Sequence, residues 1–236
     1  DPFALLAGKT SCHTGWLKSA GMLLPMGYLI GNGYADVVGD TNDVNSLRDT
    51  IHGFFNENAS IPDSGTPYYG YSGAVKCLSE GVGDVAFAKD STVDSYCGSS
   101  NASENEAWCL ARDQYIALPA FGQAPSHPVM YNPDRLDMQT RTAILNALMS
   151  MNNEMYVENY SVGGSSYTGC YDITTHRVDS TSAKNTCGSE ILDNILNTPG
   201  LVRANTQEHL GSYSSLISNV PGISAYYDTK FDITSA

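Results

Sequence analysis

A hydroxyl and a cation lie four residues apart near the start of the chain, where they could bind an anion. Residues 8–21 read GKTSCHTGWLKSAG and place Thr14 and Lys18 in a small polar turn that runs into a helical pattern. Unpaired backbone N–H groups at a helix start attract anions, and a neighbouring hydroxyl and positive charge strengthen that attraction. The alternative is a threonine N-cap followed one turn later by a solvated lysine, and the spacing alone favours this commoner arrangement.

Two further segments carry side chains that could face the same ligand. Residues 68–78 read YYGYSGAVKCL, a tyrosine-rich loop that enters a second helical pattern, and His127 follows an expected strand. Helix starts and strand ends meet at one edge of an α/β sheet, where such folds form binding clefts. Taken singly, Tyr71 is interpreted as one of many aromatic core residues and His127 as a turn residue.

Helical and extended patterns alternate along the chain and predict an α/β fold. Apolar spacing within residues 134–152 predicts a helix whose Leu136, Ile144 and Leu148 face a core. Residues 159–187 are rich in Ser, Thr and Gly and are expected to be loop and short strands. The other expected helices lie at 16–26, ending near Pro25, and at about 44–55, 188–197 and 213–219. Strands are expected at 84–89 and 115–118, and the prolines of residues 125–130 favour a short extended segment there.

Composition and charge narrow the class of protein. The chain has 236 residues, enough for one large domain or two small ones, and its net charge is −13. This charge argues against a nucleic-acid partner, because neutralising phosphates requires clustered Lys and Arg. No apolar run approaches the roughly 20 residues of a membrane helix, and the first residues do not form a signal peptide. The sequence contains no GxSxG motif for a serine nucleophile, and no cysteine is left free to pair with a histidine. We therefore expect no hydrolase activity, and we expect that the protein is not an enzyme.

Cysteines and sequons indicate an oxidising compartment. Six cysteines occur at wide spacing without a CxxC pair, which favours three disulfides over a zinc site and leaves fifteen pairings open. Cys97 and Cys109 bracket one polar loop, and Cys170 and Cys187 bracket another, so each loop is expected to be closed on itself. Glycosylation sequons begin at Asn58, Asn101 and Asn159. We therefore expect a secreted or cell-surface protein.

Several blocks of residues resemble the transferrin superfamily. Residues 8–15 with 18–21 are similar to the family's anion loop, and residues 69–74 with 76–78 to its second tyrosine-ligand segment. The stretch EGVGDVAFAK at 80–89 continues the match, and APSH at 124–127 resembles the histidine-ligand segment. The blocks follow the family's order and spacing over residues 4–131, and the similarity from 133 to 228 rests on helix placement.

The resemblance implies a fold and a domain organisation. It implies a transferrin-like lobe of the periplasmic-binding-protein type, with a mixed sheet flanked by helices and held by disulfides, in a divergent or phytotransferrin-like member. Residues 1–131 would form the second subdomain of the lobe. Residues 132–236 would contribute the remaining helices, the Cys170–Cys187 insert and a return toward the first subdomain. Cys12–Cys77 and Cys97–Cys109 would match family disulfides.

The resemblance also implies a site for ferric iron and carbonate. Tyr71 and His127 would be iron ligands. Lys89 would not bind the iron itself but would contribute, from outside the ligand set, to the acid-triggered release of iron. Carbonate would bind Thr14, Lys18, Ala20 and Gly21. The chemistry is consistent, because Fe³⁺ is a hard cation that suits phenolate and carboxylate oxygens with one imidazole.

Two departures from the family pattern bear on function. Lys18 occupies the position where the family usually has arginine. An arginine would bind the anion through two parallel hydrogen bonds, whereas lysine offers a single point charge. In the family, an aspartate ligand and a further tyrosine ligand precede the anion loop, and neither is assigned to a residue of this sequence. We therefore expect an upstream part of the lobe as a partner. A cell-surface receptor is a further expected partner. Iron uptake, transport or sequestration with acid-promoted release is the predicted function. The alternative is a transferrin-like scaffold that has lost iron and binds proteins or other ligands.

Overall fold

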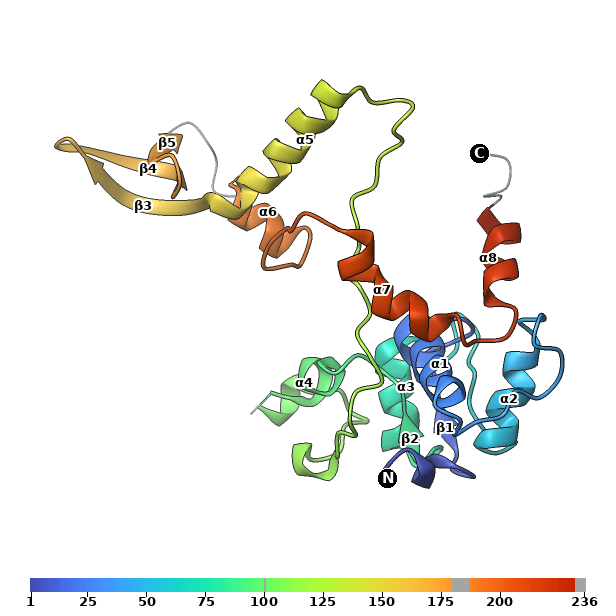
Figure 1. Ribbon diagram of the computed structural model, residues 1–236. Coiled ribbons are helices and arrows are strands. Elements are labelled where there is room, and N and C mark those ends of the chain that lie inside the picture. Colours follow the sequence, from blue (N-terminus) through green and yellow to red (C-terminus); the bar gives the residue numbers. More distant parts are fainter. Residues whose placement is uncertain (100, 180–186, 232–236) are drawn as a thin grey trace. The chain divides into compact units, whose positions relative to one another are not determined.

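The computed structural model describes residues 1–99, 101–179 and 187–231 of the chain, and these form two compact units (Figure 1). The first unit comprises residues 1–126 together with the segment that begins at Thr206. The second unit comprises His127–Asn205. The second unit is therefore inserted in the sequence of the first.

The first unit is built mainly from short helices around a small parallel sheet. Its elements are η1 (Ala4–Leu6), β1 (Ser11–Cys12), η2 (Ser19–Leu23), α1 (Leu24–Gly31), α2 (Ser46–Phe54), α3 (Gly70–Ser79), β2 (Val85–Ala86), α4 (Thr92–Cys97), η3 (Ala102–Glu104), η4 (Arg112–Gln114), α7 (Thr206–Ile217) and α8 (Ile223–Phe231). The tail from Pro221, which shows no clear period in the sequence, contains α8.

Strand β1 forms this two-stranded sheet with β2 and ends two residues before Thr14. It pairs in parallel with β2, so that Ser11 lies opposite Val85. On its other side β1 forms a bridge to Ser60, whose N–H donates to Ser11 O at 2.7 Å and whose carbonyl accepts from His13 N–H at 2.9 Å. The parallel pair joined through helices confirms the α/β prediction.

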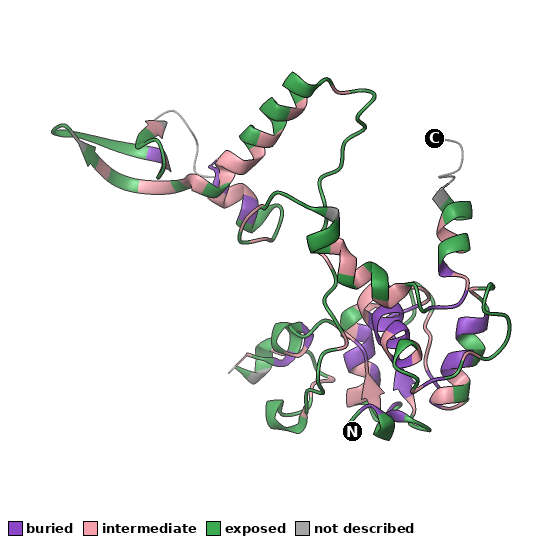
Figure 2. Cartoon of the chain, viewed as in Figure 1, coloured by how far each residue is buried: buried purple, intermediate pink, exposed green. Residues whose placement is uncertain are grey.

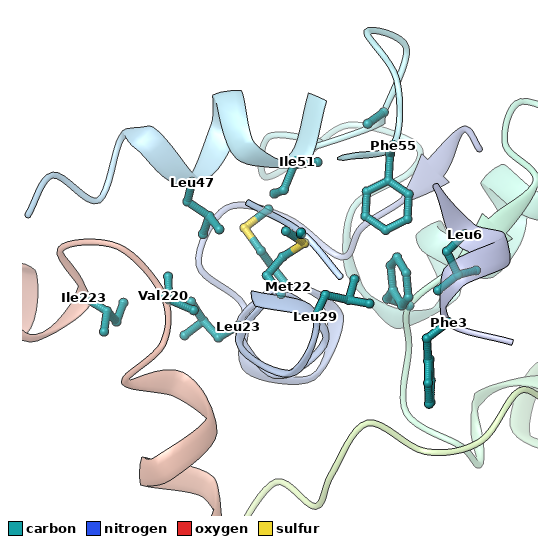
Figure 3. Close-up of a cluster of buried hydrophobic side chains, with 14 residues drawn as sticks. Phe3, Leu6, Met22, Leu23, Leu29, Leu47, Ile51, Phe55, Val220 and Ile223 are labelled. Atoms are coloured by element: carbon teal, nitrogen blue, oxygen red, sulfur yellow. The ribbon is translucent and has the colours of Figure 1, made fainter. Parts of the chain in front are cut away.

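The core of the first unit lies around α1 and η2 (Figure 2). In Figure 3, Leu47 and Ile51 point from α2 toward Met22, while Val220 from the segment after α7 lies beside Leu23. Burying side chains of this size contributes roughly 1.5–3 kcal/mol each. The helix that follows the polar turn is thus anchored on two sides.

The helix predicted at 16–26 begins later and continues further. It starts at Ser19 with the π-helical turn η2 and runs through α1 to Gly31. Pro25 does not end it, because Pro25 lies in the first turn of α1, where the missing N–H of proline costs little.

One predicted strand and one predicted core face are wrong. Residues 115–118 form no strand, and Ile116 is 87% exposed. The predicted helix at 134–152 forms as α5 (Met138–Ser150), but none of its residues is buried and Ile144 is 44% exposed. Apolar spacing identifies an apolar face, but it does not ensure that another element covers that face.

The second unit carries an antiparallel sheet that is longer than expected for residues 159–187. Its strands pair in the order β3-β4-β5, with a register shift between Val157 and Tyr160. Its elements are α5, η5 (Met151–Asn153), β3 (Glu154–Val162), β4 (Ser165–Asp172), β5 (Arg177–Asp179) and α6 (Gly188–Asn194). Residues 180–186 of the predicted insert lie outside the described residues.

All six cysteines are paired. The disulfides are Cys12–Cys77, Cys97–Cys109 and Cys170–Cys187, which confirms every expected pairing. Across the described ranges, no helix has the length and apolar character needed to cross a membrane.

Candidate functional site

The hydroxyl of Thr14 is buried in the first unit without a partner. Thr14 is 2% exposed, and no group in the described part of the chain bonds to its Oγ1. Gly21 lies directly against it, since a Cβ at residue 21 would collide with Thr14 Oγ1. A buried hydroxyl without a hydrogen bond costs about 1–3 kcal/mol, so this atom is suited to a ligand.

The start of η2 supplies backbone donors next to this hydroxyl. Lys18 is the extended N-cap residue, and its carbonyl accepts from the N–H groups of Met22 at 2.9 Å and Leu23 at 3.0 Å. The N–H groups of Ser19, Ala20 and Gly21 precede these bonds, so they have no acceptor within the helix. Such a terminus, with the positive end of the helix dipole, is suited to a small anion.

Lys18 lies against an aromatic ring. Its Nζ is 5.3 Å from the centroid of Tyr69, which is a cation–π contact. Gly15, at φ 132°, allows this arrangement, because a Cβ there would lie 2.6 Å from Tyr69 Cε2. The sequence prediction named Lys18 but not Tyr69, and nothing in the local spacing would have paired them.

Tyr71 lies on a helix that is joined to the polar turn in two ways. It is the second residue of α3 and is 45% exposed. The N–H of Gly70 donates to Thr14 O at 2.9 Å, and the Cys12–Cys77 disulfide links β1 to the same helix. The structure therefore joins the helix of Tyr71 to the loop that carries Thr14.

His13 was not assigned a role from the sequence, yet it is fully buried beside this loop. Its Nδ1 lies 2.7 Å from Gly21 O, and its Nε2 lies 3.0 Å from Ser11 Oγ. Burial lowers the pKa of His13 to about 4, and the hydrogen bond to Gly21 offsets only part of this effect. His13 is therefore neutral at physiological pH.

The other predicted site residues lie on exposed segments. Lys89 follows β2, and its carbonyl accepts from Thr92 N–H at 2.9 Å. His127 is the first residue of the second unit and lies in a segment without regular structure. No group of three or more His, Cys, Asp and Glu residues that could hold a metal occurs among residues 1–99, 101–179 and 187–231. The sequon residues Asn58, Asn101 and Asn159 are exposed.

Comparison with known proteins relates this chain to one family. Residues 56–130 match the model of the transferrin family. The chain is 37% identical to human lactotransferrin over 161 residues, covering 55% of this chain and 22% of the relative. It is 33% identical to serotransferrin of Oryctolagus cuniculus over 149 residues, covering 53% of this chain and 20% of the relative.

A third relative agrees with these two. Ovotransferrin of Gallus gallus is 36% identical over 124 residues, covering 44% of this chain and 17% of the relative. The chain spans about a fifth of the length of these relatives. The matches confirm the predicted resemblance to the transferrin superfamily and to its α/β lobe over about half of this chain.

Proposed function

We propose that this chain contributes to an extracellular site that binds ferric iron together with carbonate. The buried hydroxyl of Thr14, which lacks a protein partner and lies against Gly21 at a helix start, is the observation that carries this proposal. A small anion would satisfy that hydroxyl and the first amides of η2 at the same time.

The residues around Thr14 fit carbonate in number and chemistry. Thr14, Ala20 and Gly21 would donate hydrogen bonds, and the ammonium group of Lys18 would supply a positive charge. When bound, carbonate would offer oxygen ligands to the metal. The protein groups hold the anion and thus determine whether the metal site can form.

Tyr71 and His127 are the proposed protein ligands of iron. A phenol has a pKa near 10, so it loses its proton at neutral pH only when a metal stabilises the phenolate. The resemblance implies an aspartate and a further tyrosine from an upstream part of the lobe, which would complete the ligand set. In this proposal residues 1–131 form the second subdomain of that lobe.

Iron uptake, transport or sequestration, with a cell-surface receptor as partner, is the corresponding role. Acid would promote release, because protonation of the phenolate, the imidazole and the anion removes ligands from the metal. Lys89 is proposed to contribute to this release. The relatives named serotransferrin, lactotransferrin and ovotransferrin support the family, whereas the complete activity remains part of the proposal.

Spectroscopy tests the ligand assignment. Fe³⁺ and bicarbonate added together to the chain should produce a visible charge-transfer band from tyrosinate to iron. Tyr71→Phe should remove the band and weaken iron binding. Tyr96→Phe is the matched control, because Tyr96 is similarly exposed but lies on α4, and it should leave the band unchanged. A band that survives Tyr71→Phe would rule out this assignment.

A second candidate function is a transferrin-like module without iron. The contact between Lys18 and Tyr69 favours it, because the ring attracts the ammonium group and so competes with an anion for it. Calorimetry in the presence of bicarbonate distinguishes the two, since the module would release no heat of Fe³⁺ binding. Binding would instead support the first proposal.

A further inference from the structure

The ring of His13 has a defined tautomer because of its two partners. Gly21 O can only accept a hydrogen bond, so the Nδ1 that lies 2.7 Å away must carry the hydrogen. Nε2 is then unprotonated and accepts from the hydroxyl of Ser11 at 3.0 Å. Both polar atoms of this fully buried ring are thereby satisfied.

The same ring is held in place by two aromatic side chains. Phe87 stacks on it with ring centroids 5.1 Å apart, and Phe55 meets it edge to face at 5.8 Å. The two hydrogen-bond partners lie on opposite sides of the polar turn, Ser11 in β1 and Gly21 in η2. His13 therefore crosses the base of the turn and ties the strand before it to the helix after it.

The two hydrogen bonds of the His13 ring fix the positions of Thr14 and Gly21, which face each other at the proposed anion site. Thr14 follows His13 directly, so its position depends on where the ring is held. Gly21 is bonded through its carbonyl to the same ring and lies against the Thr14 hydroxyl. Without the ring, Gly21 O would lose its partner and the contact between Thr14 and Gly21 would lose its support.

We infer that His13 is a positioning residue, which holds the Thr14 hydroxyl and the first amides of η2 in the arrangement that receives an anion. The inference rests on the proposed function for the identity of the anion, but the positioning itself is measurable without one. A merely space-filling role would require only the shape of the ring, whereas positioning requires the hydrogen bond from Nδ1 to Gly21.

Three variants of the full chain separate these roles. His13→Leu fills much of the space but loses both hydrogen bonds. His13→Asn places an amide nitrogen where Nδ1 stands and keeps the donor to Gly21 O. Ser11→Ala removes only the partner of Nε2.

Two measurements are made on each variant. Hydrogen exchange at the amides of Met22 and Leu23 reports on η2, with the Tyr226 amide of α8 as internal reference, because it donates to Gly222 O at 3.0 Å. Titration of the metal-free chain with bicarbonate, followed by the NMR shifts of Ser19, Ala20 and Gly21, reports on the anion. We expect His13→Leu to accelerate exchange in η2 at least tenfold relative to Tyr226 and to weaken bicarbonate binding by a similar factor. His13→Asn and Ser11→Ala should each change both quantities by less than about threefold.

Each outcome decides one of the two proposals. If bicarbonate fails to shift the amides of the parent chain while exchange follows the expected order, the carbonate proposal is wrong and the positioning role stands. If bicarbonate binds the parent and His13→Leu equally well, or if His13→Asn behaves like His13→Leu, the positioning role is overturned. If His13→Leu does not fold, the comparison of His13→Asn with Ser11→Ala decides, because more than tenfold faster exchange in His13→Asn would contradict the role of the Gly21 bond.

Discussion

Gly21 lies so close to Thr14 that residue 21 has no room for a side chain, and the atom that it would meet is the buried Thr14 hydroxyl. This contact connects two residues that the sequence marks only by their separate types. Because of this contact, substitutions of Thr14 and of Gly21 should have opposite effects on the stability of the anion-free chain.

Replacing Thr14 by valine should stabilise the anion-free chain or leave it unchanged, while weakening bicarbonate binding. Valine keeps the shape and removes a buried hydroxyl that has no partner among the described residues. Thr50→Val is the matched control, because Thr50 Oγ1 donates to Ser46 O at 2.7 Å and accepts from Val38 N–H at 3.0 Å. That control should lower the free energy of unfolding by about 1–3 kcal/mol. Urea titration measures both, and a destabilised Thr14→Val would contradict the prediction.

Replacing Gly21 by alanine should lower the free energy of unfolding by roughly 1–3 kcal/mol, because the added methyl group must displace Thr14. Bicarbonate binding should weaken as well, since both sides of the contact move. Gly211→Ala in α7 meets only the end of the Gln207 side chain at 3.2 Å and serves as the control. It should be neutral or slightly stabilising in the same thermal and titration experiments.

Replacing Lys18 by arginine should strengthen bicarbonate binding several-fold. A guanidinium group donates two parallel hydrogen bonds to an anion and also stacks well on an aromatic ring such as Tyr69. Lys18→Met should weaken binding, and the exposed Lys9→Arg should have no effect. Isothermal titration with bicarbonate gives the affinities, and equal values for all four chains would show that residue 18 does not contact the anion.

Acid should destabilise the first unit through His13. Its pKa is about 4 in the folded chain and 6.5 when unfolded, so between these values the unfolded state binds a proton that the folded state does not. Stability therefore falls as the pH decreases through this window, by about 2 kcal/mol between pH 7 and pH 5.

Tryptophan fluorescence measures this effect in the first unit, because Trp16 and Trp108 both lie there. His13→Asn should remove this part of the pH dependence. His52 also affects the charge of His13, since its positive charge lowers that pKa, so His52→Gln is the second control. An unchanged pH profile in His13→Asn would assign the acid sensitivity to another group.

Removing Cys12–Cys77 should cost more stability than removing Cys97–Cys109. The first disulfide closes a separation of 65 residues and the second one of 12 residues. From loop-closure entropy, we expect the first disulfide to contribute about 4 kcal/mol to the free energy of unfolding and the second about 3 kcal/mol. Only the first should also weaken bicarbonate binding, because it links β1 to α3. Paired Cys→Ala variants measured by urea titration test both statements.

The sequence predicted the chemistry of the anion loop better than its geometry. Thr14 and Lys18 were identified by local spacing, and the helix start that they flank is present. The contact of Lys18 with Tyr69 and the burial of His13 depend on segments more than 40 residues apart or on packing against Phe55 and Phe87. Such contacts leave no periodic signal in the sequence.

Extended segments and helix faces were harder to predict for a related reason. Residues 115–118 have the composition of a strand but no strand partner in the described chain, and strand formation requires a partner for the backbone groups. The apolar residues of α5 follow helical spacing, yet they remain half-buried or exposed. The disulfides Cys97–Cys109 and Cys170–Cys187 were more predictable, because each pair brackets a loop and is close along the chain, whereas Cys12–Cys77 followed from the family resemblance.

The order of the units along the chain has a consequence for a nicked molecule. Residues 206–231 return to the first unit through packing of α7 near Gly27 and through hydrogen bonds such as Ser19 with Tyr213 and Asn219 with Gly27 O. Every cysteine is paired, and none of the three disulfides joins this segment to residues 1–126. A single proteolytic cut within residues 127–169 or 188–205, outside the loop that Cys170–Cys187 closes, would therefore turn the first unit into a two-piece complex, held by fragment complementation alone and separable on a non-reducing denaturing gel.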